Sequence, residues 1–278
     1  MPEKVVVITG ATSGIGEVAA DRLAAKGYRI VFVARDHARG EETLKHLRAI
    51  AGGVEHRVFY ADLSRLSDMK RVSAEIADAE PEIDVLVNNA GALFNAREIT
   101  EDGLELTFAL NHMSYFVVTN LLRPCLKAGS RVVSTASNAH KSAHLDFSDL
   151  QSSRGYSGFA VYGRSKLCNI LFTRELARRL EGTGVTANCL HPGFVATRFG
   201  DKSGGMLSFA IRAAKNFALT PAQGAETIVY LASSGDVAGT TGEYFYKCRP
   251  ATPTREAQND GDAKRLWEVS AAIAGLPG

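Results

Sequence analysis

Short runs of β-branched and other apolar residues alternate with longer amphipathic stretches along the whole chain. The runs typical of strands fall at 5–9, 29–34, 56–60, 84–88, 131–135, 185–190 and 243–246. Patterns with helical periodicity lie between them, at about 17–26, 38–51, 65–79, 101–127, 159–181 and 221–233, with a last one near 262–274. The strand runs are apolar almost throughout, which indicates burial on both faces. This alternation predicts an α/β fold, a single doubly wound, Rossmann-like parallel sheet with helices on both faces.

The composition is that of a soluble globular protein and argues against a nucleic-acid partner. Hydrophobic residues make up 45% and charged residues 22% of the 278 positions. The formal net charge of +2 leaves no surplus of positive charge for a phosphate backbone. Because no repeat, low-complexity segment or long linker divides the chain, we expect one domain over 1–278.

The cysteines and the first residues bear on metal binding and location. No C-x-x-C pair occurs, so we expect neither a metal site nor a disulfide framework from the widely spaced Cys125, Cys168, Cys189 and Cys248. The opening MPEKVVVITG has an apolar run too short for a signal peptide, and no stretch is long enough to span a bilayer. We therefore expect a cytoplasmic protein; peripheral membrane contact stays open.

Three glycines follow the first strand run within seven positions, at Gly10, Gly14 and Gly16. Gly10 allows a sharp turn out of the strand, Gly14 a close approach of backbone to a pyrophosphate, and Gly16 close helix packing. The helix that begins there offers free N–H groups to phosphates, and Thr12 and Ser13 add hydroxyl donors. Taken alone, the spacing fits a plain glycine turn about equally well.

The end of the second strand run bears on which dinucleotide is preferred. An acidic residue at this place accepts hydrogen bonds from the ribose of NAD, whereas a cation suits the 2′-phosphate of NADP. Ala34 is followed by Arg35 and then by Asp36. We therefore expect NADP (NADPH) in preference to NAD, with the reservation that Asp36 favours NAD if it turns inward.

Tyr162 and Lys166 are spaced i to i+4 within a helical pattern, so both project from one helix face. A nearby ammonium favours the phenolate and lowers the phenol's pKa. A shift from about 10 to about 7 takes roughly 4 kcal/mol, which a lysine and a cationic nicotinamide can supply together in a partly desolvated cleft. Such a phenol can protonate a carbonyl as hydride arrives. Considered in isolation, the pair is more often an ordinary surface pair.

Polar or small residues also follow the other strand runs, where ligands bind in such sheets. Ser137 comes just after the fifth run, and its hydroxyl would lie beside the same strand tips. Asn88–Gly91 closes the fourth run, and His191-Pro192-Gly193 follows the sixth, with Thr197 four residues later. The tyrosine and lysine are therefore not isolated.

Together these motifs resemble the short-chain dehydrogenase/reductase family over essentially the whole chain. The matching words are TGxxxGIG from Thr9, NNAG from Asn88, YxxxK from Tyr162, and PG at 192–193 followed by Thr197. The resemblance implies that Ser137 orients the carbonyl, Tyr162 is the general acid or base, Lys166 binds the nicotinamide ribose, and Asn111 anchors a relay water. The cofactor-binding residues it implies are Gly10, Thr12, Ser13, Gly14, Ile15, Gly16, Arg35, Asp62, Leu63, Asn89, Ala90, Gly91, Tyr162, Lys166, Pro192, Gly193, Val195 and Thr197.

Within the family the chain is most similar to the retinol dehydrogenase-like branch. TFALNH from Thr107, SKLCNILFTRELARRL from Ser165 and LWEVS from Leu266 read like that branch. Light-dependent protochlorophyllide reductases share several of these words, but they carry an insertion that this chain lacks. The resemblance also implies a homodimer or homotetramer in which the helices near 101–127 and 159–181 pack against their mates.

Other segments leave two interpretations open. The apolar, glycine-hinged stretch at about 194–220 is either a flap over a hydrophobic substrate or an ordinary surface helix. Trp267 either packs the last helix onto the domain or covers the pocket. Three histidines near the candidate site are interpreted as hydrogen-bonding loop residues rather than substrate contacts: His112, His140 and His144.

The function expected is hydride transfer between NADP(H) and a lipophilic aldehyde, ketone or alcohol, as in a carbonyl reductase or alcohol dehydrogenase. The alternative is a catalytically silent protein that binds NADP(H) and presents its surface to a partner. The complete set of Ser137, Tyr162, Lys166 and Asn111 argues against that alternative. An epimerase of the extended branch is disfavoured by the glycine spacing and by the lack of length for a second substrate domain.

Overall fold

The computed structural model describes residues 3–194 and 219–278. One eight-stranded sheet runs through them in the order β3-β2-β1-β4-β5-β6-β7-β8. All neighbouring strands are parallel except the last pair, in which β8 runs antiparallel to β7. The strands are β1 (Val5–Thr9), β2 (Arg29–Ala34), β3 (Arg57–Tyr60), β4 (Ile83–Asn88), β5 (Leu126–Thr135), β6 (Thr186–Leu190), β7 (Tyr244–Tyr246) and β8 (Arg249–Pro250). The predicted doubly wound, Rossmann-like sheet is confirmed.

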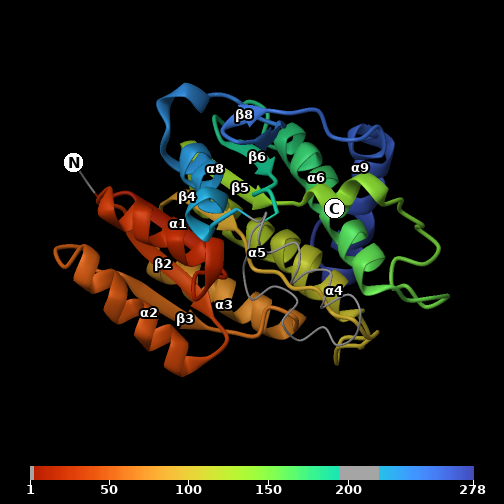
Figure 1. The fold of residues 1–278 in the computed structure, drawn as a ribbon, viewed down its shortest axis with the longest axis horizontal. Coiled ribbons are helices and arrows are strands. Elements are labelled where there is room, and N and C mark those ends of the chain that lie inside the picture. The colour runs from red at the N-terminus through yellow and green to blue at the C-terminus, as the bar shows by residue number, and fades with distance from the viewer. Residues whose placement is uncertain (1–2, 195–218) are drawn as a thin grey trace.

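Helices cover both faces of the sheet (Figure 1). The α-helices described are α1 (Gly14–Ala25), α2 (His37–Ile50), α3 (Leu66–Ala79), α4 (Leu106–Phe108), α5 (Ser114–Leu122), α6 (Gly158–Arg179), α8 (Pro221–Ser233) and α9 (Asp260–Ala274). Short turns of 3₁₀ helix, η2 (Arg123–Cys125), η3 (Asn138–Ser142), η5 (Gly235–Val237) and η6 (Glu256–Gln258), join them, and η1 (Ala109–Met113) is a turn of π-helix.

The alternation of side chains along the strands divides the core into two layers. In β1, Val5 and Val7 belong to the layer under α3, α5 and α6, whereas Val6 and Ile8 belong to the layer under α1 and α8. All four are buried, because a central parallel strand has helices on both sides. This explains why the strand runs are apolar throughout rather than alternating.

The predicted helix at 101–127 is wrong in its boundaries. Residues 101–103 form a turn, and Glu105 makes an antiparallel bridge with Ile99. Helix α4 begins only after Glu105, whose carboxylate accepts hydrogen bonds from the amides of Thr107 and Phe108 at 2.8 and 2.7 Å. The helix then widens into η1 and continues as α5. It ends at the 3₁₀ turn η2, which contains Pro124. β5 begins at Leu126, where it pairs with Ile83. Strand β8, two residues long, was not predicted.

The carboxyl-terminal helix α9 packs on α6, so the two lie side by side (Figure 1). Trp267 is 2% exposed, and its ring lies 4.9 Å from that of Phe116 in α5 and 5.8 Å from that of Phe172 in α6. Trp267 is therefore a core residue rather than a pocket cover. The surface that Phe116 and Phe172 form is covered by the chain's own helix, so the predicted packing of these helices against mates does not apply to that surface. Oligomeric state itself stays a prediction.

Two further observations concern membrane and metal. Within 3–194 and 219–278, every helix is too short or too polar to cross a bilayer. Nor do three or more His, Cys, Asp or Glu side chains of these same residues gather as metal ligands would.

Replacing Trp267 by Ala should lower the free energy of unfolding by about 3–5 kcal/mol, because the change leaves a cavity between α5, α6 and α9. Urea denaturation followed by circular dichroism measures this. Phe159→Ala is the control, since this α6 aromatic is 51% exposed and should cost less than about 0.5 kcal/mol. Equal losses in the two variants would contradict the assignment of Trp267 to the core.

Candidate active site

The carboxyl ends of β1, β4 and β5 are joined by polar side chains. The Thr9 hydroxyl accepts hydrogen bonds from the amides of Asn89 and Ala90, both at 3.0 Å. The side-chain amide of Asn89 donates to the Gly10 carbonyl at 3.2 Å, and the Thr135 hydroxyl donates to the Asn89 side-chain oxygen at 3.2 Å. The segment that follows β4 therefore lies against the glycine turn, as the order of the motifs predicts.

Close backbone contact explains why glycines occupy this turn. A Cβ on Gly10 would lie 2.8 Å from Ala90 Cα, and one on Gly16 would lie 2.1 Å from the Gly10 carbonyl oxygen. Gly14 has φ +63°, a conformation that side chains rarely adopt. These contacts bring the first turn of α1 up to the edge of the sheet.

The amino end of α1 fits an anionic group. Ser13 stands at the N-cap of this 12-residue helix, yet its side chain makes no capping hydrogen bond. The first amides of α1 therefore keep their N–H groups for another acceptor, and the helix dipole favours negative charge there. Thr12 and Ile15 beside it are half-buried. The turn thus has the properties that a pyrophosphate requires.

The two residues that follow β2 have different roles. Arg35 is exposed, whereas Asp36 is the N-cap of α2, where its carboxylate accepts a hydrogen bond from the Arg39 amide at 2.9 Å. The carboxylate of Asp36 is thus used in beginning a helix. The guanidinium of Arg35 makes no ion pair with the described residues.

The segment after β3 places the side chains of Asp62 and Leu63 in different surroundings. One carboxylate oxygen of Asp62 accepts hydrogen bonds from the amide and hydroxyl of Ser64, at 3.0 and 2.7 Å. The side chain of Leu63 is buried in the core. Only the main chain of Leu63 is therefore placed to contact an adenine, because its side chain is used in packing.

Helix α6 carries Tyr162 and Lys166 to the end of β5. A side-chain hydrogen bond joins Tyr162 to Ser137, whose own oxygen accepts from the Ala139 amide at 3.2 Å. The Lys166 ammonium donates to the Thr135 carbonyl at 3.0 Å and lies 5.6 Å from the centre of the Tyr162 ring. The serine, the phenol and the lysine, predicted from separate segments, therefore meet at one place.

Burial has the largest effect on the pKa values of Tyr162 and Lys166 in the chain alone. It raises the pKa of Tyr162 to about 12, against the opposing effect of the Ser137 hydrogen bond. It also lowers the pKa of Lys166 to about 7. The lowering of the phenol pKa is predicted for Lys166 together with a cationic nicotinamide, and in the chain alone the desolvation of both groups has the larger effect. A further positive charge is needed to reverse the sign.

Asn111 lies in the π-turn η1, next to Lys166 and Gly91. Its amide donates to the Ala92 carbonyl at 2.9 Å and to the Ser165 hydroxyl at 3.0 Å, and its oxygen accepts from the Ala92 amide at 2.9 Å. A Cβ on Gly91 would lie 3.1 Å from this oxygen and 3.4 Å from the Lys166 ammonium. The side chain of Asn111 thus holds the segment after β4 against α6, and both protons of its amide are used in doing so.

Two histidines that the sequence motifs do not single out for catalysis support the strand ends. His140 is buried beneath Ser137, and its Nδ1 lies 2.7 Å from the Ser137 carbonyl oxygen. His191, at the end of β6, accepts a hydrogen bond from the Gly193 amide at 3.1 Å and stacks on Tyr246. These two hydrogen bonds span only three and two residues, whereas the contacts of His140 with Thr254 and of His191 with Tyr246 join segments that become neighbours only in the fold.

The structure describes only part of the predicted nicotinamide segment. Pro192 and Gly193 follow β6 and are half-buried. Val195 and Thr197 lie outside the described residues, as does most of the proposed flap at about 194–220.

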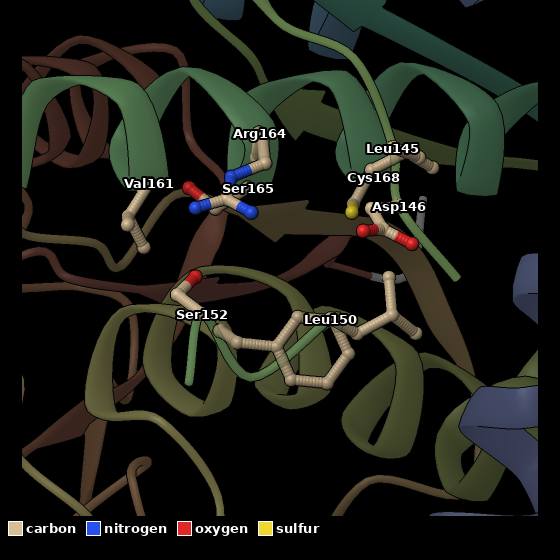
Figure 2. Close-up of a pocket in the computed structure, with 9 residues that line it drawn as sticks. Leu145, Asp146, Leu150, Ser152, Val161, Arg164, Ser165 and Cys168 are labelled. Atoms are coloured by element: carbon tan, nitrogen blue, oxygen red, sulfur yellow. The ribbon is translucent and has the colours of Figure 1, made fainter. Parts of the chain in front are cut away.

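Figure 2 shows a hollow beside α6, which contributes Val161, Arg164, Ser165 and Cys168 to it. Tyr162 and Lys166 are not among its lining residues. With a volume of about 10 Å³ it has room for about one water molecule, so it is too small for an organic substrate. Its walls come from α4, α6 and the loop before α6: Phe108, Leu145, Asp146, Leu150, Ser152, Val161, Arg164, Ser165 and Cys168.

Comparison with known proteins agrees with the geometry. A profile of the short chain dehydrogenase family matches residues 4–206. Human retinol dehydrogenase 14 is 40% identical, in an alignment that covers 99% of this chain and 88% of that protein. An uncharacterized protein from Mycobacterium Paratuberculosis has a similar structure, with a TM-score of 0.79, 32% identity, and coverage of 98% of this chain and 94% of its own. A short chain dehydrogenase from Burkholderia cenocepacia J2315, solved in complex with NADP, gives a TM-score of 0.71 at 25% identity, over 87% and 95% of the two chains.

Burial of Lys166 should appear as a pH dependence of stability. The pKa falls from 10.5 in the unfolded chain to about 7 in the folded one, so between these values the unfolded chain binds the extra proton. Stability due to this group therefore rises with pH. Relative to Lys166→Met, the free energy of unfolding of the wild type should increase by about 1 kcal/mol per pH unit between pH 7 and 9. Urea denaturation at three pH values measures the difference, and a constant difference would contradict it.

Proposed function

Because the chain belongs to the short-chain dehydrogenase family of oxidoreductases, we propose that it transfers hydride between NADP(H) and a lipophilic aldehyde, ketone or matching alcohol. The observation that carries this proposal is the meeting of Ser137, Tyr162 and Lys166 at the end of β5. The glycine turn of β1 lies at the same edge of the sheet, two strands away.

The residues that would hold the dinucleotide lie at the carboxyl ends of the parallel strands. The amides at the start of α1, with Thr12, Ser13 and Gly14, bind the pyrophosphate. Asp62 and the main chain of Leu63 would bind the adenine, and Asn89, Ala90 and Gly91 would also contact the cofactor. Pro192, Gly193, Val195 and Thr197 bind the nicotinamide, which supplies or accepts the hydride when the cofactor is bound.

Proton transfer is assigned to Tyr162. In reduction its hydroxyl donates a proton to the substrate oxygen as that oxygen gains negative charge; in oxidation the phenolate takes the proton back. Ser137 donates a hydrogen bond to the same oxygen and fixes its position. The positive charge of Lys166 and of the oxidised nicotinamide stabilises the phenolate, which offsets the burial that raises its pKa in the chain alone.

Preference for NADP over NAD is supported by the end of β2. The carboxylate of Asp36 is engaged at the N-cap of α2, which leaves the exposed guanidinium of Arg35 as the charged group for a 2′-phosphate. The structurally similar dehydrogenase from Burkholderia cenocepacia is a complex with NADP, which agrees with this assignment.

The substrate class is supported by the relatives. Retinol dehydrogenases 14 and 13 match nearly the whole chain, and retinol is a lipophilic alcohol. Phe194, which follows Gly193, is 53% exposed, and an exposed aromatic side chain at this place favours an apolar substrate.

We also propose a cytoplasmic location, which rests on the sequence alone. Cell fractionation tests it.

Replacing Tyr162 by Phe should lower turnover by at least about 100-fold, because the ring stays and the proton donor is lost. A panel of aldehydes and ketones of graded size, retinaldehyde included, identifies the substrate by oxidation of NADPH. Binding of NADPH, followed by its fluorescence, should change less than about threefold. Tyr230→Phe, in α8, is the control. A Tyr162→Phe variant with normal turnover refutes the mechanism, and wild-type binding without turnover of any substrate supports the silent alternative.

Replacing Arg35 by Ala should weaken NADPH binding by about 10–100-fold, since charge-assisted hydrogen bonds contribute about 1.5–3 kcal/mol. Binding of NADH, which lacks the 2′-phosphate, should not change. Isothermal titration of both cofactors tests this. Lys45→Ala removes one charge from the exposed side of α2 and should affect neither. Equal weakening of the two cofactors would exclude Arg35 as the phosphate contact.

A further inference from the structure

His140 contacts the carbonyl oxygen of Ser137 with both its side chain and its main chain. It lies in η3, three residues after Ser137, and is fully buried. Its Nδ1 lies 2.7 Å from the Ser137 carbonyl oxygen, and its amide donates to the same oxygen at 3.2 Å. A carbonyl only accepts hydrogen bonds, so Nδ1 carries the proton and Nε2 is an acceptor.

The other ring nitrogen is held by a distant part of the chain. The Thr254 amide donates to Nε2 at 3.4 Å, from the segment that leads from β8 to α9. This bond agrees with the same tautomer. His140 therefore links the candidate catalytic serine to the carboxyl-terminal segment, 114 residues away in the sequence.

Aromatic packing keeps the imidazole in one orientation. The Tyr244 ring meets it edge to face, with centroids 5.3 Å apart. Tyr244 also lies 5.7 Å from the ring of His191, which accepts from the Gly193 amide. The same aromatic group thus contacts the segments after both β5 and β6. Burial lowers the pKa of His140, so it brings no charge to the site at neutral pH.

We propose that His140 is a positioning residue, which through its Nδ1–H bond to the Ser137 carbonyl sets the direction of the Ser137 hydroxyl toward Tyr162 and the substrate oxygen. Ser137 is then held by the Ala139 amide at its side chain and by His140 at its main chain. His140 touches no reacting atom. The effect of His140 on turnover rests on the proposed function. Its effect on the hydrogen bond between the Ala139 amide and the Ser137 side chain does not.

The test compares two amides that each replace one nitrogen of the ring. In His140→Asn the side-chain amide reaches the place of Nδ1 and keeps the donor to Ser137, whereas in His140→Gln it reaches the place of Nε2 and loses that donor. Turnover should fall by about 10–100-fold in the Gln variant and by less than about fivefold in the Asn variant. The Michaelis constant should change less than turnover, and NADPH affinity should not change.

A pH profile separates positioning from simple loss of structure. The Ser137 hydrogen bond lowers the pKa of Tyr162, so misplacing the serine should move the basic limb of the profile to higher pH in the Gln variant. His144→Ala is the matched control, because this histidine is four residues away with a side chain 78% exposed. It should leave turnover and the profile unchanged.

Hydrogen exchange supplies a readout that needs no substrate. In cofactor-free protein, exchange at the Ala139 amide should speed up at least tenfold in the Gln variant and stay near the wild-type rate in the Asn variant. If the wild type turns over no substrate, the proposed function fails while this measurement still tests His140. Equal effects of Asn and Gln, in exchange or in turnover, would overturn the proposal, and so would unchanged exchange in the Gln variant.

Discussion

The arrangement of the site depends on the close approach of the β1 and β4 ends at Gly10 and Ala90. With the Thr9 hydroxyl accepting from two amides of the next segment, there is no room for a Cβ on either Gly10 or Gly16. Asn89 carries the contact to Thr135 at the end of β5, and the Thr135 carbonyl in turn accepts from Lys166. A continuous set of hydrogen bonds therefore connects the glycine turn to the candidate catalytic helix.

Burial gives this edge of the sheet its electrostatic character. Tyr162 and Lys166 are both desolvated, so their pKa values move toward the neutral forms, up for the phenol and down for the ammonium. In such surroundings a positive charge from a bound dinucleotide has a larger effect than it would have in water. A further positive charge beside Tyr162 would therefore lower the pKa of its phenol strongly.

The carboxyl-terminal residues belong to the support of the site. Trp267 of α9 fills the space between α5 and α6, and Ser270 bonds to the buried His112, which follows Asn111 in the π-turn, at 2.8 Å. Thr254 reaches His140 beneath Ser137. Both histidines were interpreted from the sequence as loop residues, and both in fact connect a candidate catalytic segment to the end of the chain.

Local patterns in the sequence were sufficient for the order of strands and helices, the glycine turn, and the Tyr162–Lys166 pair, because each depends on residues a few positions apart. Parallel topology then places the carboxyl ends of β1 to β7 at one edge, so Ser137 and the segment after β4 were also predictable. Other features came only with the tertiary structure: the break of the 101–127 helix, the buried side chain of Leu63, the direction of the Tyr162 pKa shift, and the bond from His140 to Ser137 and Thr254. Some of these contacts span only a few residues, as the Glu105 cap and the His140–Ser137 bond do. They are nevertheless settled by burial and by partners far away in the sequence, such as Ile83 for Leu126 and Thr254 for His140, which no local spacing encodes.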